Sequence, residues 1–114
     1  MKLRVLGAQR AAGMNKTEGD YALILEARRA AGQIAAWRYE GLRLKLGDGS
    51  YYTADFALLL PDGTLELHET KGFMREAARV RLRSAAAQWP VRIVLIRRDP
   101  RVTHGWLLED VPHG

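Results

Sequence analysis

The apolar positions follow a helical period near the start of the chain. Tyr21 and Leu25 recur at helical spacing after Asn15, a residue that favours the N-cap position, so we predict a helix over residues 15–32. Glu18 stands three residues after Asn15, which is the spacing of a capping box. Glu18 also falls on the apolar stripe, so its side chain should face the sheet.

Three segments of alternating apolar and polar residues come next, at residues 34–46, 51–60 and 64–71. Alternation is typical of strands, and the short turn sequences between these segments predict an antiparallel meander. The alternation in the first segment changes parity at Gly41, so we expect a β-bulge at that residue.

A second helical period covers residues 73–89, and Pro90 ends it. Residues 91–96 are continuously apolar, which is typical of a strand buried on both faces. Because this strand follows a helix, we expect it to pair in parallel with the third strand through a right-handed crossover. Residues 106–111 are a candidate edge strand. The predicted fold is α/β, in the order α-β-β-β-α-β, with a mixed central sheet flanked by helices.

Length and composition limit the kinds of protein that this chain can be. It has 114 residues, of which 47% are apolar, so we expect one domain over residues 15–114, after a basic arm or short strand at residues 1–14. The absence of cysteine excludes disulfides, thiolate zinc sites and cysteine nucleophiles, and it fits a cytoplasmic protein. No apolar run approaches the length of a membrane span, so we expect no membrane partner.

The chain is basic, with 18 Lys and Arg residues against 13 Asp and Glu residues and a net charge of +5. A small basic domain favours a polyanionic partner, and nucleic acid is the first candidate. Four arginines on the predicted second helix are candidates for phosphate contacts, although such a row is also typical of a solvated face. They are Arg75, Arg79, Arg81 and Arg83.

Candidate chemistry lies on the second and third predicted strands. Asp55 is on the second strand, while Glu69 and Lys71 share one face of the third, because side chains alternate along a strand. Glu18 can reach the same end of the sheet from the first helix. Charges that continue an apolar face are costly unless a partner compensates them, and a divalent cation with oxygen ligands is a suitable partner.

This set of residues suits phosphodiester hydrolysis. Two or three carboxylates hold Mg²⁺, which polarises the phosphate and lowers the pKa of a bound water. A lysine beside the ion orients or deprotonates that water, or neutralises the charge that builds up on the phosphate. Glu18 has a competing role as the capping-box glutamate, and the two roles are compatible.

The spacing of Asp55, Glu69 and Lys71 resembles the motif of the PD-(D/E)XK nuclease superfamily. Glu18 resembles the acidic residue that many members carry on their first helix. One position departs from the motif, because Ala54 stands where the superfamily has proline. More closely, the chain resembles a group of small phage and prophage proteins that share a domain of unknown function. This second resemblance runs through residues 15–18, 25–29, 31–32, 51–56, 68–73 and 78–80 and continues into the strand after Pro90.

The superfamily resemblance implies a restriction-endonuclease-like core and cleavage of DNA that depends on Mg²⁺, with Mn²⁺ as a substitute ion. It implies metal ligation by Asp55, Glu69 and the carbonyl of Thr70. Glu18 would be an added ligand, and Lys71 would be the catalytic lysine. A small member without a recognition domain favours branched DNA, such as a Holliday junction, and a homodimer. The resemblance also favours a phage or prophage gene that is expressed in a bacterial host cell.

Two other functions stay open at this point. One is a nucleic-acid-binding module of the same fold without catalysis, and the other is a phage protein that binds a protein partner. Among the remaining acidic residues, Glu26, Glu40 and Glu66 are expected to be exposed to solvent. His68 is expected to be a packed or surface residue rather than a base, and the tryptophans are expected in the core.

Overall fold

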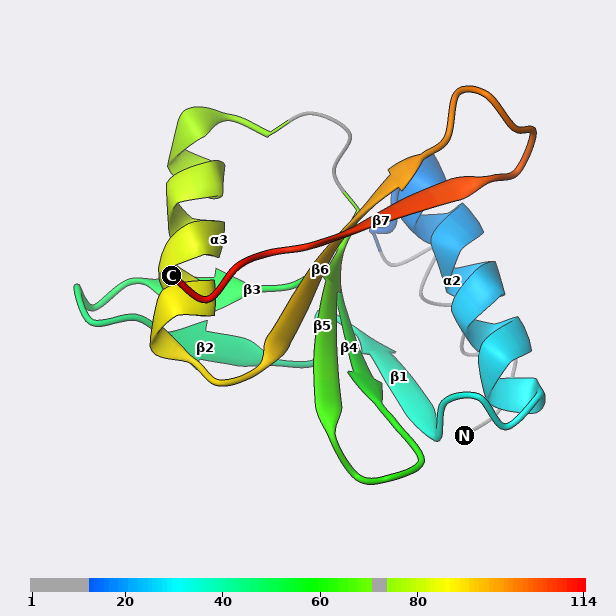
Figure 1. Ribbon diagram of the computed structural model, residues 1–114, viewed down its shortest axis with the longest axis horizontal. Helices are drawn as coiled ribbons and strands as arrows, with labels where there is room; N and C mark the ends of the chain where they lie inside the picture. The colour runs from blue at the N-terminus through cyan, green and yellow to red at the C-terminus, as the bar shows by residue number, and fades with distance from the viewer. Residues whose placement is uncertain (1–12, 71–73) are drawn as a thin grey trace.

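A computed structural model of the protein describes residues 13–70 and 74–114 (Figure 1). Its elements follow in the order α2 (Lys16–Ala30), β1 (Ala36–Tyr39), β2 (Arg43–Lys45), β3 (Tyr51–Thr53), β4 (Phe56–Leu59), β5 (Leu65–Glu69), α3 (Glu76–Gln88), β6 (Arg92–Arg98) and β7 (Trp106–Asp110). Figure 1 shows α2 and α3 on opposite sides of a central sheet. The predicted arm or strand at residues 1–14 lies outside the described residues, except for its last two.

Five strands form one mixed sheet in the order β1-β4-β5-β6-β7, and β2 pairs with β3 in a separate small sheet. β5 pairs in parallel with β6, whereas the other paired strands are antiparallel. The predicted parallel pairing is therefore confirmed, as is the edge position of β7, which ends the strand order. The structure has the predicted α/β class and the predicted mixed sheet between two helices.

The first two predicted strands are not continuous. The first divides into β1 and β2, and the second divides into β3 and β4. The two breaks face each other, because the backbone N–H of Glu40 donates to the carbonyl of Asp55 at 2.8 Å. Glu40 has a positive φ of 49°, and a Cβ added at Gly41 would lie 2.3 Å from the Cβ of Arg38, so only glycine fits there. The bulge predicted at Gly41 is instead the point at which the chain leaves the main sheet.

The described residues form two hydrophobic cores, one on each face of the main sheet. α2 packs over the core that contains Trp37 and Phe56, while α3 and the small sheet enclose the core that contains Tyr52 and Leu67. Tyr52 and Phe56 have the same parity in the sequence but face different cores. The chain therefore reverses its facing between them, and this reversal places Asp55 at the boundary of the two cores.

The capping box at the start of α2 is confirmed. The N–H of Glu18 donates to Oδ1 of Asn15 at 2.8 Å, and the N–H of Asn15 donates to Oε1 of Glu18 at 2.9 Å. The second helix begins at Glu76, with Arg75 as a cap residue that makes no side-chain cap bond. The predicted start at residue 73 lies outside the described residues. Within the described residues, no helix is both long enough and apolar enough to cross a lipid bilayer.

Three predictions of side-chain exposure are wrong. Glu26 is buried rather than solvated, because Arg29 donates to both of its carboxylate oxygens. Glu66 is buried as well, since Arg92 reaches it from the neighbouring strand. Trp89 is 40% exposed rather than part of the core, because it lies just beyond the end of α3. In each case, an ion-pair partner or the end of a helix outweighs the local pattern of apolar positions.

Candidate active site

A cleft of about 350 Å³ opens where β3 and β4 separate. Its walls come from the small sheet, from the turn before β4, from the end of β5 and from α3. Asp55, Glu69 and Arg81 line the cleft. The structure thus brings together two of the predicted metal ligands and one of the predicted DNA-binding arginines.

The Asp55 carboxylate is buried at the edge of this cleft and is held by Thr70, the residue that follows β5. The backbone N–H and the hydroxyl of Thr70 both donate to Oδ2 of Asp55 at 2.9 Å. Two donors on one oxygen fix the orientation of the carboxylate. Thr70, whose carbonyl is the predicted metal ligand, therefore lies directly beside Asp55.

The Glu69 carboxylate lies at the end of β5 and is only 4% exposed. The hydroxyl of Tyr52 donates to its Oε1 at 2.8 Å. Burial raises the pKa of Tyr52, and the negative charge of Glu69 raises it further. The hydroxyl consequently keeps its proton at neutral pH and remains a donor to Glu69.

The Glu18 carboxyl is 5% exposed and reaches the same region from the first turn of α2. The Tyr39 hydroxyl donates to its Oε1 at 3.2 Å, and the Asp55 carboxyl lies within hydrogen-bonding reach. Burial raises the pKa of Glu18, and the charge of Asp55 raises it further, against the opposing bond from the Asn15 N–H. Glu18 and Asp55 form a pair of buried carboxyl groups, which favours a cation beside them.

The described residues contain no group of three or more His, Asp or Glu side chains that is arranged to hold a metal ion. A pair of carboxylates is nevertheless a suitable donor set for Mg²⁺, which keeps several waters and commonly binds one or two carboxylates together with substrate phosphates. Glu18 and Asp55 supply such a pair, and Glu69 lines the same cleft as Asp55. The chemistry of this pair of carboxylates therefore fits a hard divalent cation.

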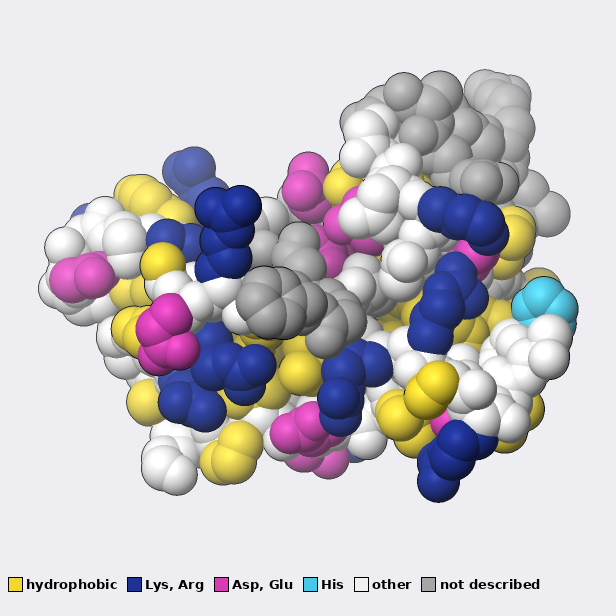
Figure 2. Space-filling view, turned by 90° about the horizontal axis from the view of Figure 1, so that it is seen from above, with side chains coloured by type: hydrophobic (Ala, Val, Ile, Leu, Met, Phe, Trp, Pro, Cys, Tyr) yellow, Lys and Arg dark blue, Asp and Glu magenta, His cyan; other side chains and the backbone are white. Residues whose placement is uncertain are grey.

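Basic side chains lie on the same face of the molecule as the cleft. Figure 2 shows acidic side chains near the centre of this face, with groups of Lys and Arg side chains on either side. On α3, Arg81 lines the cleft, and the other predicted DNA-binding arginines are exposed, namely Arg75, Arg79 and Arg83. Lys71 lies outside the described residues, so its place in the site stays a prediction from the sequence.

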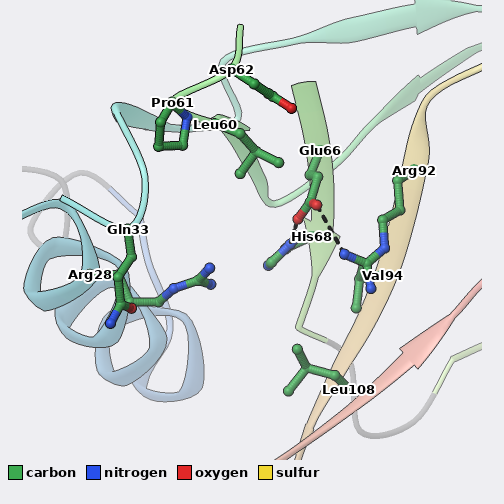
Figure 3. A pocket seen from close by; sticks show the side chains of 10 residues that line it. All are labelled: Arg28, Gln33, Leu60, Pro61, Asp62, Glu66, His68, Arg92, Val94 and Leu108. Atoms are coloured by element: carbon green, nitrogen blue, oxygen red, sulfur yellow. Dashed lines mark hydrogen bonds and ion pairs between the residues drawn. The ribbon is translucent and has the colours of Figure 1, made fainter. Parts of the chain in front are cut away.

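A second polar cluster lies on the α2 face of the sheet, beside a cavity of about 380 Å³ (Figure 3). Tyr21 bonds Nδ1 of the buried His68 at 2.6 Å, Nε2 of His68 bonds Glu66 at 3.1 Å, and Arg92 donates to Glu66 at 2.9 Å. Burial lowers the pKa of His68, against the raising effect of Glu66. His68 is packed, as expected. The sequence did not predict the cluster, because its four members come from three separate elements, α2, β5 and β6, and only Glu66 and His68 are close in the sequence.

No protein-family model, curated protein or solved structure matches this chain. The case for a function therefore rests on the geometry of the residues themselves and on the resemblance carried by the motif.

Proposed function

We propose that the protein is a Mg²⁺-dependent DNA endonuclease with the restriction-endonuclease-like core of the PD-(D/E)XK superfamily. One observation carries the proposal. Three carboxyl groups far apart in the sequence, those of Glu18, Asp55 and Glu69, are buried around one break in the sheet, and Asp55 is near enough to Glu18 to raise its pKa. Burying like charges together is costly, so this arrangement favours a site that gains a cation on binding its substrate.

Each residue has a defined role in this proposal. Asp55 and Glu18 would hold Mg²⁺. The superfamily resemblance implies Glu69 and the carbonyl of Thr70 as further ligands, although the described residues hold no group of three acidic side chains arranged around one ion. The bound ion supplies Lewis-acid polarisation of the phosphate and activation of water. Tyr52 and Thr70 orient Glu69 and Asp55 through the hydrogen bonds described above. Lys71, two residues after Glu69, would orient water or neutralise charge on the phosphate during cleavage.

The proposed substrate is DNA, because Arg81 lines the cleft beside the carboxylates and Arg79 and Arg83, on another side of α3, are exposed as well. Such a surface contacts the phosphate backbone and does not read bases. The resemblance to small phage and prophage proteins additionally favours branched DNA as the preferred structure, a homodimer as the active form, and action in the cytoplasm of a bacterial host.

The direct test is a cleavage assay on linear, flap and four-way DNA in the presence of Mg²⁺ or EDTA. We expect cleavage only with Mg²⁺ and fastest on branched DNA. Binding of DNA without cleavage, in a protein that binds the metal, would instead identify a catalytically silent nucleic-acid-binding module.

Calorimetry with Mn²⁺ tests the metal site separately. Asp55→Asn should weaken binding strongly, since it removes the charge from a ligand whose position Thr70 fixes. Asp48→Asn is the matched control, because it makes the same chemical change in an exposed turn outside the cleft, where Asp48 accepts bonds from Ser50. Equal binding by both variants would place the metal elsewhere.

A further inference from the structure

A second cleft, of about 470 Å³, adjoins the carboxylate site on the side away from α3. Thr17 of α2 and Thr70 line it, together with Arg97 and Arg98 at the end of β6. Thr70 belongs to both places, because its side chain lines this cleft and its hydroxyl donates to Asp55. The two sites are therefore next to each other and share one residue.

The polar residues that line this second cleft are basic or neutral. Its polar lining residues are Arg97, Arg98, Thr17 and Thr70, and no carboxylate occurs among the described residues that line it. Because the Thr70 hydroxyl donates to Asp55, the donors for a ligand are the two guanidinium groups and the Thr17 hydroxyl. Guanidinium groups donate hydrogen bonds, accept none and carry charge at every physiological pH. A cleft with these donors suits an anion that presents several oxygen acceptors, as a phosphate does.

Both arginines have partners that a phosphate can replace or tolerate. Arg97 donates to Glu109 at 3.1 Å, and the two side chains are 43% and 60% exposed. Exposed ion pairs of this kind contribute little to stability, so exchanging Glu109 for a phosphate costs little. Arg98 pairs with Asp20 and stacks over the ring of Trp106 at 4.8 Å, which holds its guanidinium in place.

We propose that this cleft binds a phosphate of the DNA strand next to the phosphate that lies at the carboxylates. The strand then passes over Thr70, between the arginines of α3 on one side and Arg97 and Arg98 on the other. Figure 2 shows groups of Lys and Arg side chains on both halves of this face of the molecule. The inference rests on the proposed function for its substrate, but it concerns binding and not cleavage.

The test measures the salt dependence of binding to a fluorescein-labelled DNA duplex, by anisotropy, in EDTA, where no cleavage occurs. Arg97→Gln should reduce the slope of log K against log salt by about 0.9, which is the effect of one lost phosphate contact. Arg101→Gln is the matched control. Arg101 follows the same strand, pairs with Asp99 and does not line the cleft, so its loss should leave the slope unchanged.

A second pair of variants predicts a change of the opposite sign. Glu109→Gln releases Arg97 for the phosphate and should tighten binding. Asp110→Asn also removes one negative charge, at the next position of β7, but it releases Arg92, which lies outside the cleft. It should therefore tighten DNA binding less than Glu109→Gln does. Equal slopes for Arg97→Gln and Arg101→Gln, or equal tightening by the two carboxylate variants, would overturn the inference.

These outcomes separate the inference from the proposed function. A protein that cleaves DNA, but whose Arg97→Gln variant keeps the parental slope, is a nuclease without this phosphate site. A protein that never cleaves DNA, but whose Arg97→Gln variant loses the expected slope, has the site without the nuclease activity. Circular dichroism of each variant checks that the fold is retained, which the exposure of Arg97 favours.

Discussion

Replacing Glu18 by glutamine separates its two roles, because the substitution keeps the shape of the side chain and removes its charge. The glutamine Oε1 can still accept from the Asn15 N–H and the Tyr39 hydroxyl, so the capping box survives in a neutral form. The new amide N–H can donate to Asp55, which in the parent is a like-charged neighbour. We therefore expect the folded protein to become more stable at neutral pH.

The size of the gain can be bounded from the raised pKa of Glu18. At pH 7 the penalty for keeping its charge cannot exceed the cost of protonation, which is about 3.4 kcal/mol for a carboxyl group with an ordinary pKa of 4.5, at 1.36 kcal/mol per pH unit. The raised pKa already includes the opposing cap bond from Asn15, so this figure is an upper limit on the gain in stability. At about 4 °C per kcal/mol for a domain of this size, the rise in Tm is positive and below about 14 °C.

The effect of pH on this gain has a definite sign. Because the pKa of Glu18 is raised in the folded state, the folded protein binds the proton more tightly than the unfolded chain does. Its charge therefore destabilises the fold above the unfolded pKa, and the penalty disappears at lower pH. The difference in Tm between Glu18→Gln and the parent should be large at pH 7 and should vanish by about pH 4.

Glu26→Gln is the control on the same helix, and it should behave in the opposite way. The bonds from Arg29 lower the pKa of Glu26 and outweigh the raising effect of burial, so its charge stabilises the fold above the unfolded pKa. Its loss should cost about 1 kcal/mol at pH 7 and less in acid, where the parent loses the same charge. Thermal unfolding in EDTA, followed by circular dichroism, measures both variants.

Two further measurements on Glu18→Gln are the effect of Mg²⁺ on its Tm and its rate of DNA cleavage. Mg²⁺ should raise the Tm of the parent, because it binds only the folded state, and should raise that of Glu18→Gln much less. Cleavage should fall with the lost ligand. A Glu18→Gln protein that is less stable at pH 7 and cleaves DNA at the parental rate would leave Glu18 with the capping role alone.

Three further predictions concern other residues. Lys71→Ala should bind DNA in Ca²⁺ as the parent does but cleave about a hundred-fold more slowly in Mg²⁺, since only transition-state stabilisation is lost; parental cleavage with weaker binding would make it a phosphate anchor. Arg79→Ala should lower the salt slope of duplex binding by about 0.9 for all sequences alike, and a changed base preference at constant slope would contradict this. His68→Gln should remove a loss of stability below about pH 6.5, where the unfolded parent binds a proton that the buried imidazole, with its lowered pKa, refuses. Urea unfolding at about pH 7.5 and about pH 5.5 measures this difference, and identical pH dependence in both proteins would exclude it.

The parts of the fold that depend on short-range signals could be predicted from the sequence. The capping box is a contact between residues three apart, so Asn15 and Glu18 are sufficient to identify it. The parallel pairing of β5 with β6 could be predicted because a helix lies between these two apolar strands. Antiparallel neighbours can be joined by a tight turn, whereas parallel neighbours need a long crossover, which is usually a helix. Glu18 was likewise correctly placed on the buried stripe of α2.

The remaining features depend on partners that the sequence does not identify. Glu66 looks like a solvated strand position, yet it is buried because Arg92, 26 residues later, donates to it. The division of the first two predicted strands depends on the backbone hydrogen bond between Glu40 and Asp55, and no local sequence pattern predicts this bond. The sequence likewise does not identify Thr70 as the residue that holds Asp55. The N–H and hydroxyl of Thr70 donate to a carboxylate 15 residues earlier in the chain, and no local pattern indicates such a contact.

The division of these strands also explains how three carboxyl groups can be buried so close together. On a continuous strand, alternation would place Asp55 within one core, without the donors that a buried carboxylate needs. At the boundary of the two cores, polar groups from both faces reach the carboxyl groups: Tyr39 from the α2 side donates to Glu18, and Tyr52 from the α3 side donates to Glu69. The break that defeats the strand prediction is thus the feature that makes the candidate site possible.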